Sequence, residues 1–152
     1  LATETIEGIS QIATQAEVNT GVDDSKIVTS KKLKNLLGGS NVNFSSNGYQ
    51  KLPSGMIIQW GSILFNGLPD AAFSSSPDTQ VYFPIVFPNN CFVVNVNGSG
   101  NESGIAGNEG TESSHSCYNK TKSGFVHHAI RLQGGDGNGT EKGTASWIAI
   151  GY

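Results

Sequence analysis

The stretch from Ala2 to Leu36 constrains the fold of this chain most strongly, because it predicts two short helices that bury almost nothing by themselves. Thr14 to Glu17 reads Thr-Gln-Ala-Glu, a capping box in which the threonine and glutamate side chains each satisfy a free amide at a helix start. Gly21 is predicted to end this helix in a left-handed conformation. Isolated helices shorter than about 12 residues are marginal in water, so these helices need a partner surface.

A second short helix is predicted to begin at Thr29 or Ser30. Its last turn is rich in lysine, and positive charge there suits the helix dipole; the lysines are Lys31, Lys32 and Lys34. Gly38 and Gly39 then end the helix.

The composition limits the class of protein. The 152 residues suit one domain with a short preceding segment, and Leu1 leads us to expect a fragment trimmed from a longer protein. Only 36% of the residues are hydrophobic and 20 are glycine, so oligomerisation would have to supply burial that a monomeric core lacks. A net charge of −3 disfavours nucleic acid as a partner. No run of about 18 apolar residues predicts a membrane span.

After Gly39 the pattern becomes strand-like. Between Met56 and Ile63 the side chains of Met56, Ile58 and Trp60 point one way and those of Ile57, Gln59 and Gly61 the other, an alternation expected of a strand. Further strands are predicted over Val81 to Phe87, Cys91 to Val96, Phe125 to Leu132 and Ser146 to Tyr152, with turns at Asn97-Gly98, Asp136-Gly137 and Asn138-Gly139. The fold class is therefore mainly β, a small antiparallel β-sandwich preceded by two small helices.

Two of these strands carry more specific predictions. Pro84 and Pro88 cannot donate to a ladder, so the strand at Val81 to Phe87 should be an edge strand or carry a bulge. In the next strand the expected apolar face consists of Phe92, Val94 and Val96, opposite Cys91, Val93 and Asn95. Cys91 and Cys117, the latter in a predicted loop, are expected to be free thiols.

Two long loops are predicted, Gly98 to Gly124 and Gln133 to Thr144, and both are rich in Gly, Asn, Ser, Thr and acidic residues. Connections longer than about 12–15 residues are usually functional or disordered. Asn, Asp and Glu side chains can bond to sugar hydroxyls, and Tyr118 could stack on a sugar ring. A solvated linker without a binding role is the alternative from composition alone.

The N-terminal segments ATET, EGISQIATQAEV, TGVDD and IVTSKKL resemble a repeat found along bacteriophage tail-fibre shafts. The runs GYQKLPSGMIIQWG, VYFPIVFPNNC and ASWIAIGY resemble the C-terminal receptor-binding tip of a tail fibre from a Mu-like or P2-like contractile-tailed phage or a related tailocin. The region between Asn97 and Gly143 is unmatched, and the resemblance implies that receptor specificity varies there.

The resemblance implies a division into a shaft repeat at 1–39, a linker at 40–54 and a β-rich receptor-binding tip at 55–152. It implies a homotrimeric fibre whose tip lies at the distal end of the tail fibre in the virion. It also implies assembly in the host cytoplasm with a dedicated chaperone, which we expect to engage the apolar run from Ala145 to Tyr152 or the loops above it. The expected receptor is a host-surface glycan, most plausibly lipopolysaccharide, bound without chemical modification.

The candidate receptor-binding residues come from both loops and the strand between them, and Arg131 is the candidate partner for a phosphate of the lipopolysaccharide core; the full set is Asn101, Glu102, Tyr118, Arg131, Asp136 and Asn138. Trp60 and Trp147 are excluded as packing residues. No catalytic residue, metal ligand or cofactor is predicted.

Two other functions remain open at this point. One is a polysaccharide depolymerase, for which the loop carboxylates would have to supply a catalytic pair; these are Glu102, Glu109, Glu112, Asp136 and Glu141. The other is a purely structural trimerisation tip. His127 and His128 fall on opposite faces of their strand, and His128 is interpreted as a hydrogen-bonded core or interface residue, with an axial metal in the trimer as the alternative.

Overall fold

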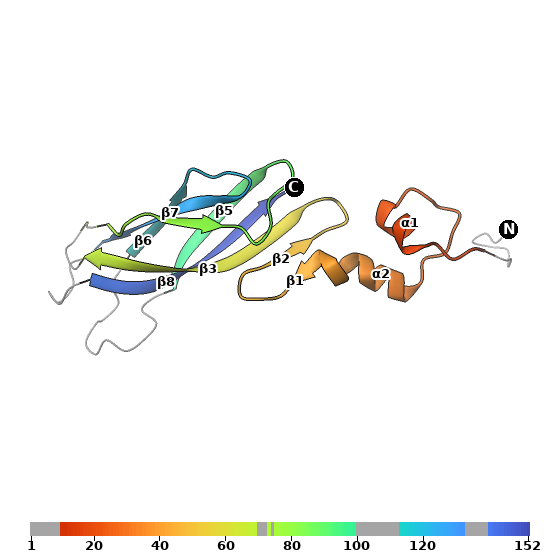
Figure 1. Ribbon diagram of the computed structural model, residues 1–152, viewed down its shortest axis with the longest axis horizontal. Coiled ribbons are helices and arrows are strands. Elements are labelled where there is room, and N and C mark those ends of the chain that lie inside the picture. The colour runs from red at the N-terminus through yellow and green to blue at the C-terminus, as the bar shows by residue number, and fades with distance from the viewer. Residues whose placement is uncertain (1–9, 70–72, 74, 100–112, 133–139) are drawn as a thin grey trace.

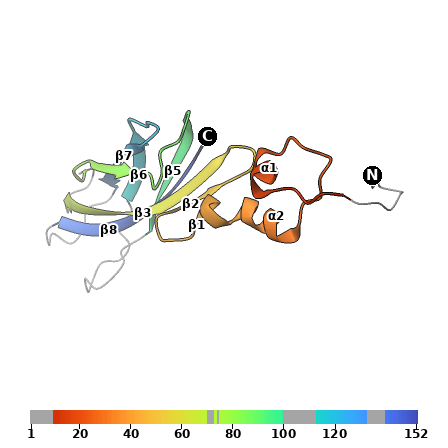
Figure 2. The same cartoon turned by 45° about the vertical axis from the view of Figure 1, so that its right-hand side comes forward.

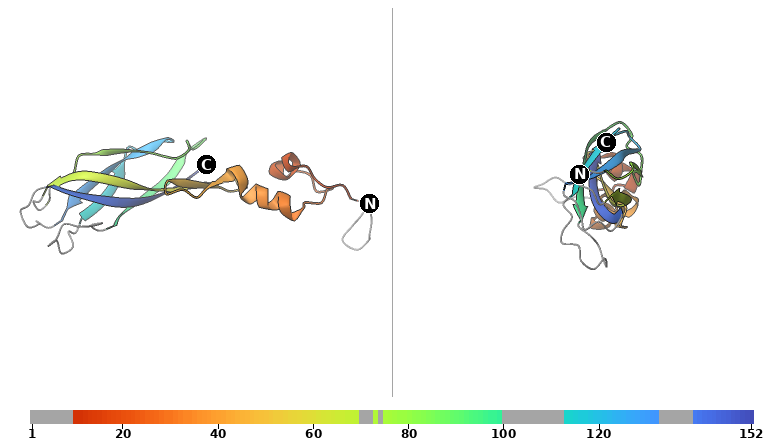
Figure 3. Two further views of the ribbon diagram at one scale, coloured as in Figure 1. Left: turned by 60° about the horizontal axis from the view of Figure 1, so that its bottom comes forward. Right: turned by 90° about the vertical axis from the view of Figure 1, so that its left-hand side faces the viewer.

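Two helices are followed by a β-sandwich that extends away from them, and the computed structural model describes residues 10–69, 73, 75–99, 113–132 and 140–152 (Figure 1). The helices and the sandwich lie end to end along the long axis of the molecule (Figure 3, left). The elements in chain order are α1 (Gln15–Thr20), α2 (Ser30–Leu37), a 3-10 turn (Gly39–Asn41), β1 (Val42–Asn43), β2 (Gly48–Lys51), β3 (Ile57–Pro69), β4 (Thr79–Tyr82), β5 (Cys91–Ser99), β6 (Ser113–Tyr118), β7 (Gly124–Arg131) and β8 (Thr140–Gly151).

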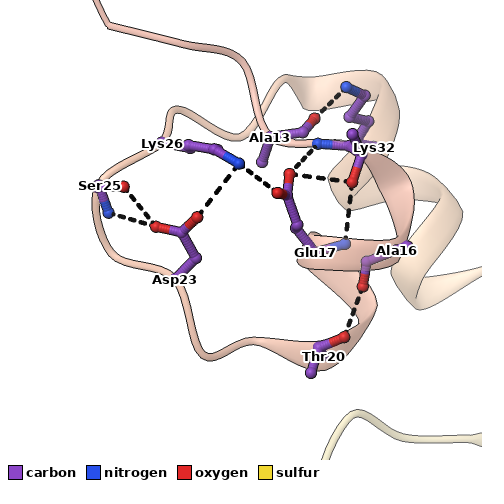
Figure 4. A network of polar contacts seen from close by, with 9 residues as sticks. Ala13, Ala16, Glu17, Thr20, Asp23, Ser25, Lys26 and Lys32 are labelled. Atoms are coloured by element: carbon purple, nitrogen blue, oxygen red, sulfur yellow. Dashed lines mark hydrogen bonds and ion pairs between the residues drawn. The ribbon is translucent and has the colours of Figure 1, made fainter.

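The first helix is built as the sequence predicts. The Thr14 backbone amide donates to Glu17 Oε2 at 2.7 Å, and the Glu17 amide donates to the Thr14 hydroxyl at 3.2 Å, which completes the capping box. Gly21 ends α1 with φ of 67°. Lys26 forms an ion pair with Glu17, and its hydrogen bond is the largest cause that lowers the pKa of the Glu17 carboxyl (Figure 4).

The second helix begins after Thr29, whose side chain caps the backbone amide of Lys32 at 3.4 Å. A parallel bridge between Ile12 and Ile27 ties the two ends of the intervening segment together. Gln15 Nε2 donates to the Lys32 carbonyl at 3.1 Å, so α1 and α2 stabilise each other. No helix in the described ranges is both long and apolar enough to cross a membrane.

Two antiparallel sheets form the sandwich (Figure 2). The larger has the strand order β1-β2-β3-β8-β5, and the smaller has the order β4-β7-β6. β5 and β6 are in contact along one side, where Cys117 Sγ lies 3.6 Å from the Val94 carbonyl oxygen. The segment 40–54, predicted as a linker, contains β1 and β2, and these strands pair in series with β3.

The core between the sheets is aromatic. Phe83 lies 5.1 Å from Phe87, 5.8 Å from Phe125 and 5.6 Å from Trp147, measured between ring centroids. Phe87 and Phe125 are fully buried. Trp147 is therefore a packing residue, as predicted. Trp60 also packs, on the outer face of the larger sheet, where its ring stacks on Phe44.

A buried glutamine fastens the β4–β5 connection to the core. Gln59 on β3 has no exposed surface. Its Oε1 accepts a hydrogen bond from the Ile85 amide at 3.0 Å, and its Nε2 donates to the Ile85 carbonyl at 2.9 Å. One side chain thus satisfies both polar groups of a residue that lies outside any strand.

The predicted edge strand is confirmed, but it ends earlier than predicted. β4 is an edge strand of the smaller sheet and ends before Pro84, which could not have donated to the ladder. β8, by contrast, is paired on both sides, with β3 and with β5. The apolar run from Ala145 to Tyr152 is therefore not a free edge in the folded chain.

The predicted division of β5 side chains between the two faces is wrong at the start of the strand. The register shifts between Cys91 and Val93, and this bulge turns Cys91 inward while Phe92 becomes about half exposed and stacks on Tyr152. The predicted turn at Asn97-Gly98 is also wrong, because β5 continues to Ser99. Gly98 is needed for close approach: a Cβ there would lie 2.3 Å from His115 Nε2.

Both predicted loops are shorter than expected in the described ranges. β6 lies inside the segment Gly98 to Gly124, so Cys117 is a strand residue rather than a loop residue. The start of β8 takes residues 140–144 from the second predicted loop. Cys91 and Cys117 are free thiols, as predicted.

Candidate functional site

The outer face of the β4–β7–β6 sheet is polar, and strand alternation produces it. Inward-facing side chains on β7 are those of Phe125, His127, Ala129 and Arg131, all of them buried. The outward-facing side chains of the three strands are Ser114, Ser116 and Tyr118 on β6, Val126, His128 and Ile130 on β7, and Gln80 and Tyr82 on β4. We call this surface the β4–β7–β6 outer face.

A carboxylate lies at the β4 edge of this face. Asp78 directly precedes β4, and the pairing of Thr79 and of Cys117 with His127 places Asp78, His128 and Ser116 at the same level of the sheet. Asp78 Oδ1 lies 2.8 Å from His128 Nδ1. The Tyr118 hydroxyl donates a hydrogen bond to Asp78 Oδ2. One carboxylate thus holds a tyrosine and a histidine from two different strands.

The electrostatics of this cluster follow from its hydrogen bonds. The bond from Tyr118, and then the bond to His128, lower the pKa of the Asp78 carboxyl below its ordinary value. The same bond to Asp78 raises the pKa of the Tyr118 hydroxyl. Asp78 is therefore an anion and Tyr118 a neutral donor near pH 7. Tyr118 keeps 41% of its surface exposed, so its ring remains accessible to a ligand.

The cluster offers the groups that recognise hydroxyl-rich molecules. A carboxylate has about four lone-pair positions, and the two internal hydrogen bonds use two of them. Serine hydroxyls at positions 114 and 116 can both donate and accept. An accessible tyrosine ring gives an apolar surface beside them. The arrangement can therefore bind a hydroxyl-rich ligand through hydrogen bonds and through contact with the tyrosine ring.

Catalytic chemistry has little support at this cluster. Glycosidases use two carboxylates, one of them with a raised pKa. Asp78 has a lowered pKa, and it is the only carboxylate among the described sandwich residues whose side chains are placed. Nor do three metal-binding side chains converge on one position anywhere in the described ranges.

A pair of histidines lies in the core beneath this face. His115 Nδ1 lies 3.0 Å from His127 Nε2, and the two rings stack with centroids 5.2 Å apart. Phe65 packs against both rings. Burial lowers the pKa of His127 to about 4 and also lowers the pKa of His115. Both are thus neutral near pH 7, with one ring nitrogen donating to the other.

The histidine prediction is partly confirmed. His127 and His128 do lie on opposite faces of β7, and His128 is hydrogen-bonded, to Asp78. The core position, however, belongs to His127 and not to His128. Strand alternation alone could not decide which face of β7 is inward, because Val126 and Ile130 share the outer face with His128.

Of the predicted binding residues, Tyr118 lies on the β4–β7–β6 outer face. Arg131, proposed as a partner for phosphate, is fully buried on the inward face of β7, so its guanidinium is not presented to a ligand at the surface. The remaining four lie outside the described residues: Asn101, Glu102, Asp136 and Asn138. Asp78 and His128 were missed as site residues, since no sequence signal links Asp78 to Tyr118 and His128, which lie 40 and 50 residues further along the chain.

The outer face of the larger sheet is different in character. Apolar side chains gather on part of it, namely Val93, Ile58, Trp60, Ile148 and Ile150, beside the polar side chains of Ser62, Asn95, Asn97 and Ser146. Beside it lies a groove of about 480 Å³ next to α2, lined chiefly by Leu33, Leu37, Val42 and Phe44. Phe44 stacks on Trp60 and so connects the groove to the sheet. We call this continuous surface the apolar stripe.

An elongated chain with a short helical segment, a β-sandwich, a polar face and an apolar stripe has the construction of a fibre tip. Residues 51–152 match the family model of the gp53-like tail fibre protein, C-terminal, and the chain therefore belongs to this tail-fibre family. The match confirms the resemblance to a phage tail-fibre tip and supports a receptor-binding tail-fibre role. It also supports a component of a virion or tailocin.

Solved tail fibres share the fold. The N-truncated R1-type pyocin tail fiber has a TM-score of 0.54 at 22% identity, covering 73% of this chain and 84% of that chain. The R1 pyocin fiber of P. aeruginosa has a TM-score of 0.56 at 18% identity, covering 99% of this chain and 40% of that one. These likenesses confirm the mainly β fold with short preceding helices.

A relative outside phages also matches. The uncharacterized protein MJ0347 of Methanocaldococcus jannaschii is 33% identical over 106 residues, which cover 70% of this chain. The chain spans 63% of the length of that relative.

Proposed function

We propose that this chain is the homotrimeric receptor-binding tip of a tail fibre and that it adsorbs to host lipopolysaccharide without modifying it. The observation that carries the proposal is the Asp78 carboxylate on the β4–β7–β6 outer face, which holds Tyr118 and His128 in place at an accessible surface. Fixed polar groups beside an accessible aromatic ring bind sugars at a low entropic cost, because they are already ordered before the ligand arrives.

The two outer faces of the sandwich have different roles in this proposal. The apolar stripe is the natural contact between copies of the chain, since a large exposed apolar surface marks an interface. The β4–β7–β6 outer face would then remain open to the receptor. Three copies of a weak site on each tip, and several fibres on each particle, raise avidity by about 10²–10⁴.

The two loops predicted from the sequence, 98–124 and 133–144, belong to the same proposal. Ser99, Ser113 and Thr140 are strand residues at the end of the sandwich away from the helices (Figure 1). The segments 100–112 and 133–139 carry further candidate contacts, namely Asn101, Glu102, Asp136 and Asn138. Exchange of 98–124 and 133–144 with those of a fibre of different host range should transfer adsorption.

The proposal extends to position and assembly. The tip lies at the distal end of the fibre, which assembles in the host cytoplasm, and the divisions 1–39, 40–54 and 55–152 describe shaft, linker and tip. An assembly chaperone protects strand edges before three chains meet, since non-local β pairings form slowly. Equal yields of soluble trimer with and without the neighbouring assembly protein would remove the need for it.

Adsorption of the isolated tip to host cells tests the proposal. Cells with complete lipopolysaccharide should bind the tip, and isogenic cells with truncated lipopolysaccharide should not. Tyr118→Phe should weaken binding because it removes the donor to Asp78. Tyr152→Phe is a matched control, since Tyr152 is 44% exposed and lies away from the β4–β7–β6 outer face. Equal binding to both cell types would contradict lipopolysaccharide as the receptor.

A further inference from the structure

A groove runs beside the β4–β7–β6 outer face, between β4 and the part of β3 that extends beyond β2. β2 pairs with β3 only as far as Trp60, so the later residues of β3 have no strand on that side. The groove has a volume of about 340 Å³. This lies at the lower end of the range for small-molecule sites, roughly 300–1,000 Å³.

Polar groups without charge line the groove. Asn47 Oδ1 accepts a hydrogen bond from the Ser62 amide at 3.0 Å, which fixes the side chain and leaves its Nδ2 as a donor. Gln80 Nε2 donates to the Phe125 carbonyl at 3.0 Å, which leaves Gln80 Oε1 as an acceptor. Tyr82 is 73% exposed and forms one wall. No charged side chain occurs among the described residues of its lining.

The groove and the Asp78 cluster are neighbours. Thr79 lines the groove and follows Asp78 directly in the chain, and Gln80 and Tyr82 belong both to the groove and to the β4–β7–β6 outer face. A ligand that lies across β4 would therefore contact both.

Asp78 is the only carboxylate of this combined surface among the described residues. His128 is the basic side chain in contact with it, with Nδ1 2.8 Å from Asp78 Oδ1. The other basic side chains nearby are engaged elsewhere: Arg131 is buried, while Lys120 donates to the Phe92 carbonyl and Lys122 donates to the Pro88 carbonyl at 3.1 Å. An acidic or phosphorylated sugar would therefore meet a carboxylate whose one basic neighbour is already bonded to it, which is unfavourable at short range.

We infer that the β3–β4 groove is a saccharide subsite and that, with the Asp78 cluster, it takes a neutral, hydroxyl-rich sugar and disfavours acidic or phosphorylated ones. The inference rests on the proposed function, since it concerns the same receptor. It places the contact on uncharged sugars of lipopolysaccharide and away from its phosphates.

Calorimetry with a soluble probe tests the inference. The probe is the oligosaccharide released by mild acid from lipopolysaccharide of a strain to which the tip adsorbs, before and after its phosphates are removed with hydrofluoric acid. Binding should be tighter after dephosphorylation, by about threefold or more. Equal or weaker binding after dephosphorylation would overturn the inference while leaving the proposed function intact.

Variants locate the site. Tyr82→Ala should weaken binding of both probes about tenfold, on the scale of a lost aromatic contact, whereas Tyr152→Ala should leave it unchanged. Asp78→Asn should raise the affinity for the phosphorylated probe relative to the dephosphorylated one at least threefold, and Asp24→Asn should not. If Tyr118→Phe weakens binding but Tyr82→Ala does not, the groove is not a subsite. A tip that adsorbs to no host strain would instead contradict the proposed function.

Discussion

His115 Nδ1 and His127 Nε2 lie 3.0 Å apart in the core of the sandwich, and only one of these nitrogens can carry a proton in that contact. Protonation of both rings would place two positive charges in an aromatic interior next to Phe65. The pair is thus compatible with the fold only while it is neutral.

The stability of the tip should fall between pH 6.5 and 4. Burial lowers the folded-state pKa of His127 from 6.5 to about 4, so the unfolded chain binds more protons in this window. The contribution of the neutral ring is fully present above pH 6.5 and is lost as the pH falls, by about 3 kcal/mol in the free energy of unfolding. Urea titrations at several pH values measure this loss in the free energy of unfolding. A flat profile over this window would show that the pair is not buried.

Gln59→Leu should lower the free energy of unfolding by about 2–4 kcal/mol, because it leaves both polar backbone groups of Ile85 buried without partners. Gln50→Leu is a matched control, since Gln50 donates to the Leu37 carbonyl in an exposed position, and it should cost less than about 1 kcal/mol. Denaturant unfolding of both variants checks the difference. Equal effects would mean that the Ile85 contact is not structural.

The apolar stripe should hold the trimer together. Ile148→Asp places a charge on its exposed part and should convert the trimer to monomers, because an unpaired charge at an apolar interface is strongly disfavoured. Ser116→Asp on the β4–β7–β6 outer face should leave three chains together. Light scattering gives the mass of each. A wild-type monomer at micromolar concentration would rule out the trimer itself.

Purified lipopolysaccharide should remain intact after long incubation with the tip. Asp78 cannot act as a general acid with a lowered pKa, and a glycosidase needs such an acid beside a second carboxylate. Assays for reducing ends should therefore stay at background. Cleavage that disappears in Asp78→Asn, Asp136→Asn or Glu141→Gln would establish a depolymerase instead.

Local signals in the sequence predicted local structure well. Thr14, Glu17 and Gly21 define α1 through contacts within one turn, so the pattern contains all the information needed. The alternation of β3 was likewise legible, but it did not show that Gln59 faces the core while Trp60 lies on the outer face. The tail-fibre class followed from motifs at both ends of the chain.

Features that depend on distant contacts were not predictable. The inward turn of Cys91 requires a bulge that only pairing with β8 reveals. β6 looked like a loop because three of its six residues are serine and the others, His115, Cys117 and Tyr118, form no apolar alternation. Asp78 acquires its role solely from Tyr118 and His128, which reach it from two other strands of the sheet.

The dissociation constant of the purified trimeric tip for host lipopolysaccharide, compared with that of Asp78→Ala/Tyr118→Ala, tests receptor binding by the β4–β7–β6 outer face. We expect the double variant to remain trimeric and folded and to lose at least tenfold in affinity, because it removes a charged hydrogen-bonding group and the ring beside it. A folded double variant that binds as tightly as the wild type would place the receptor site elsewhere on the tip.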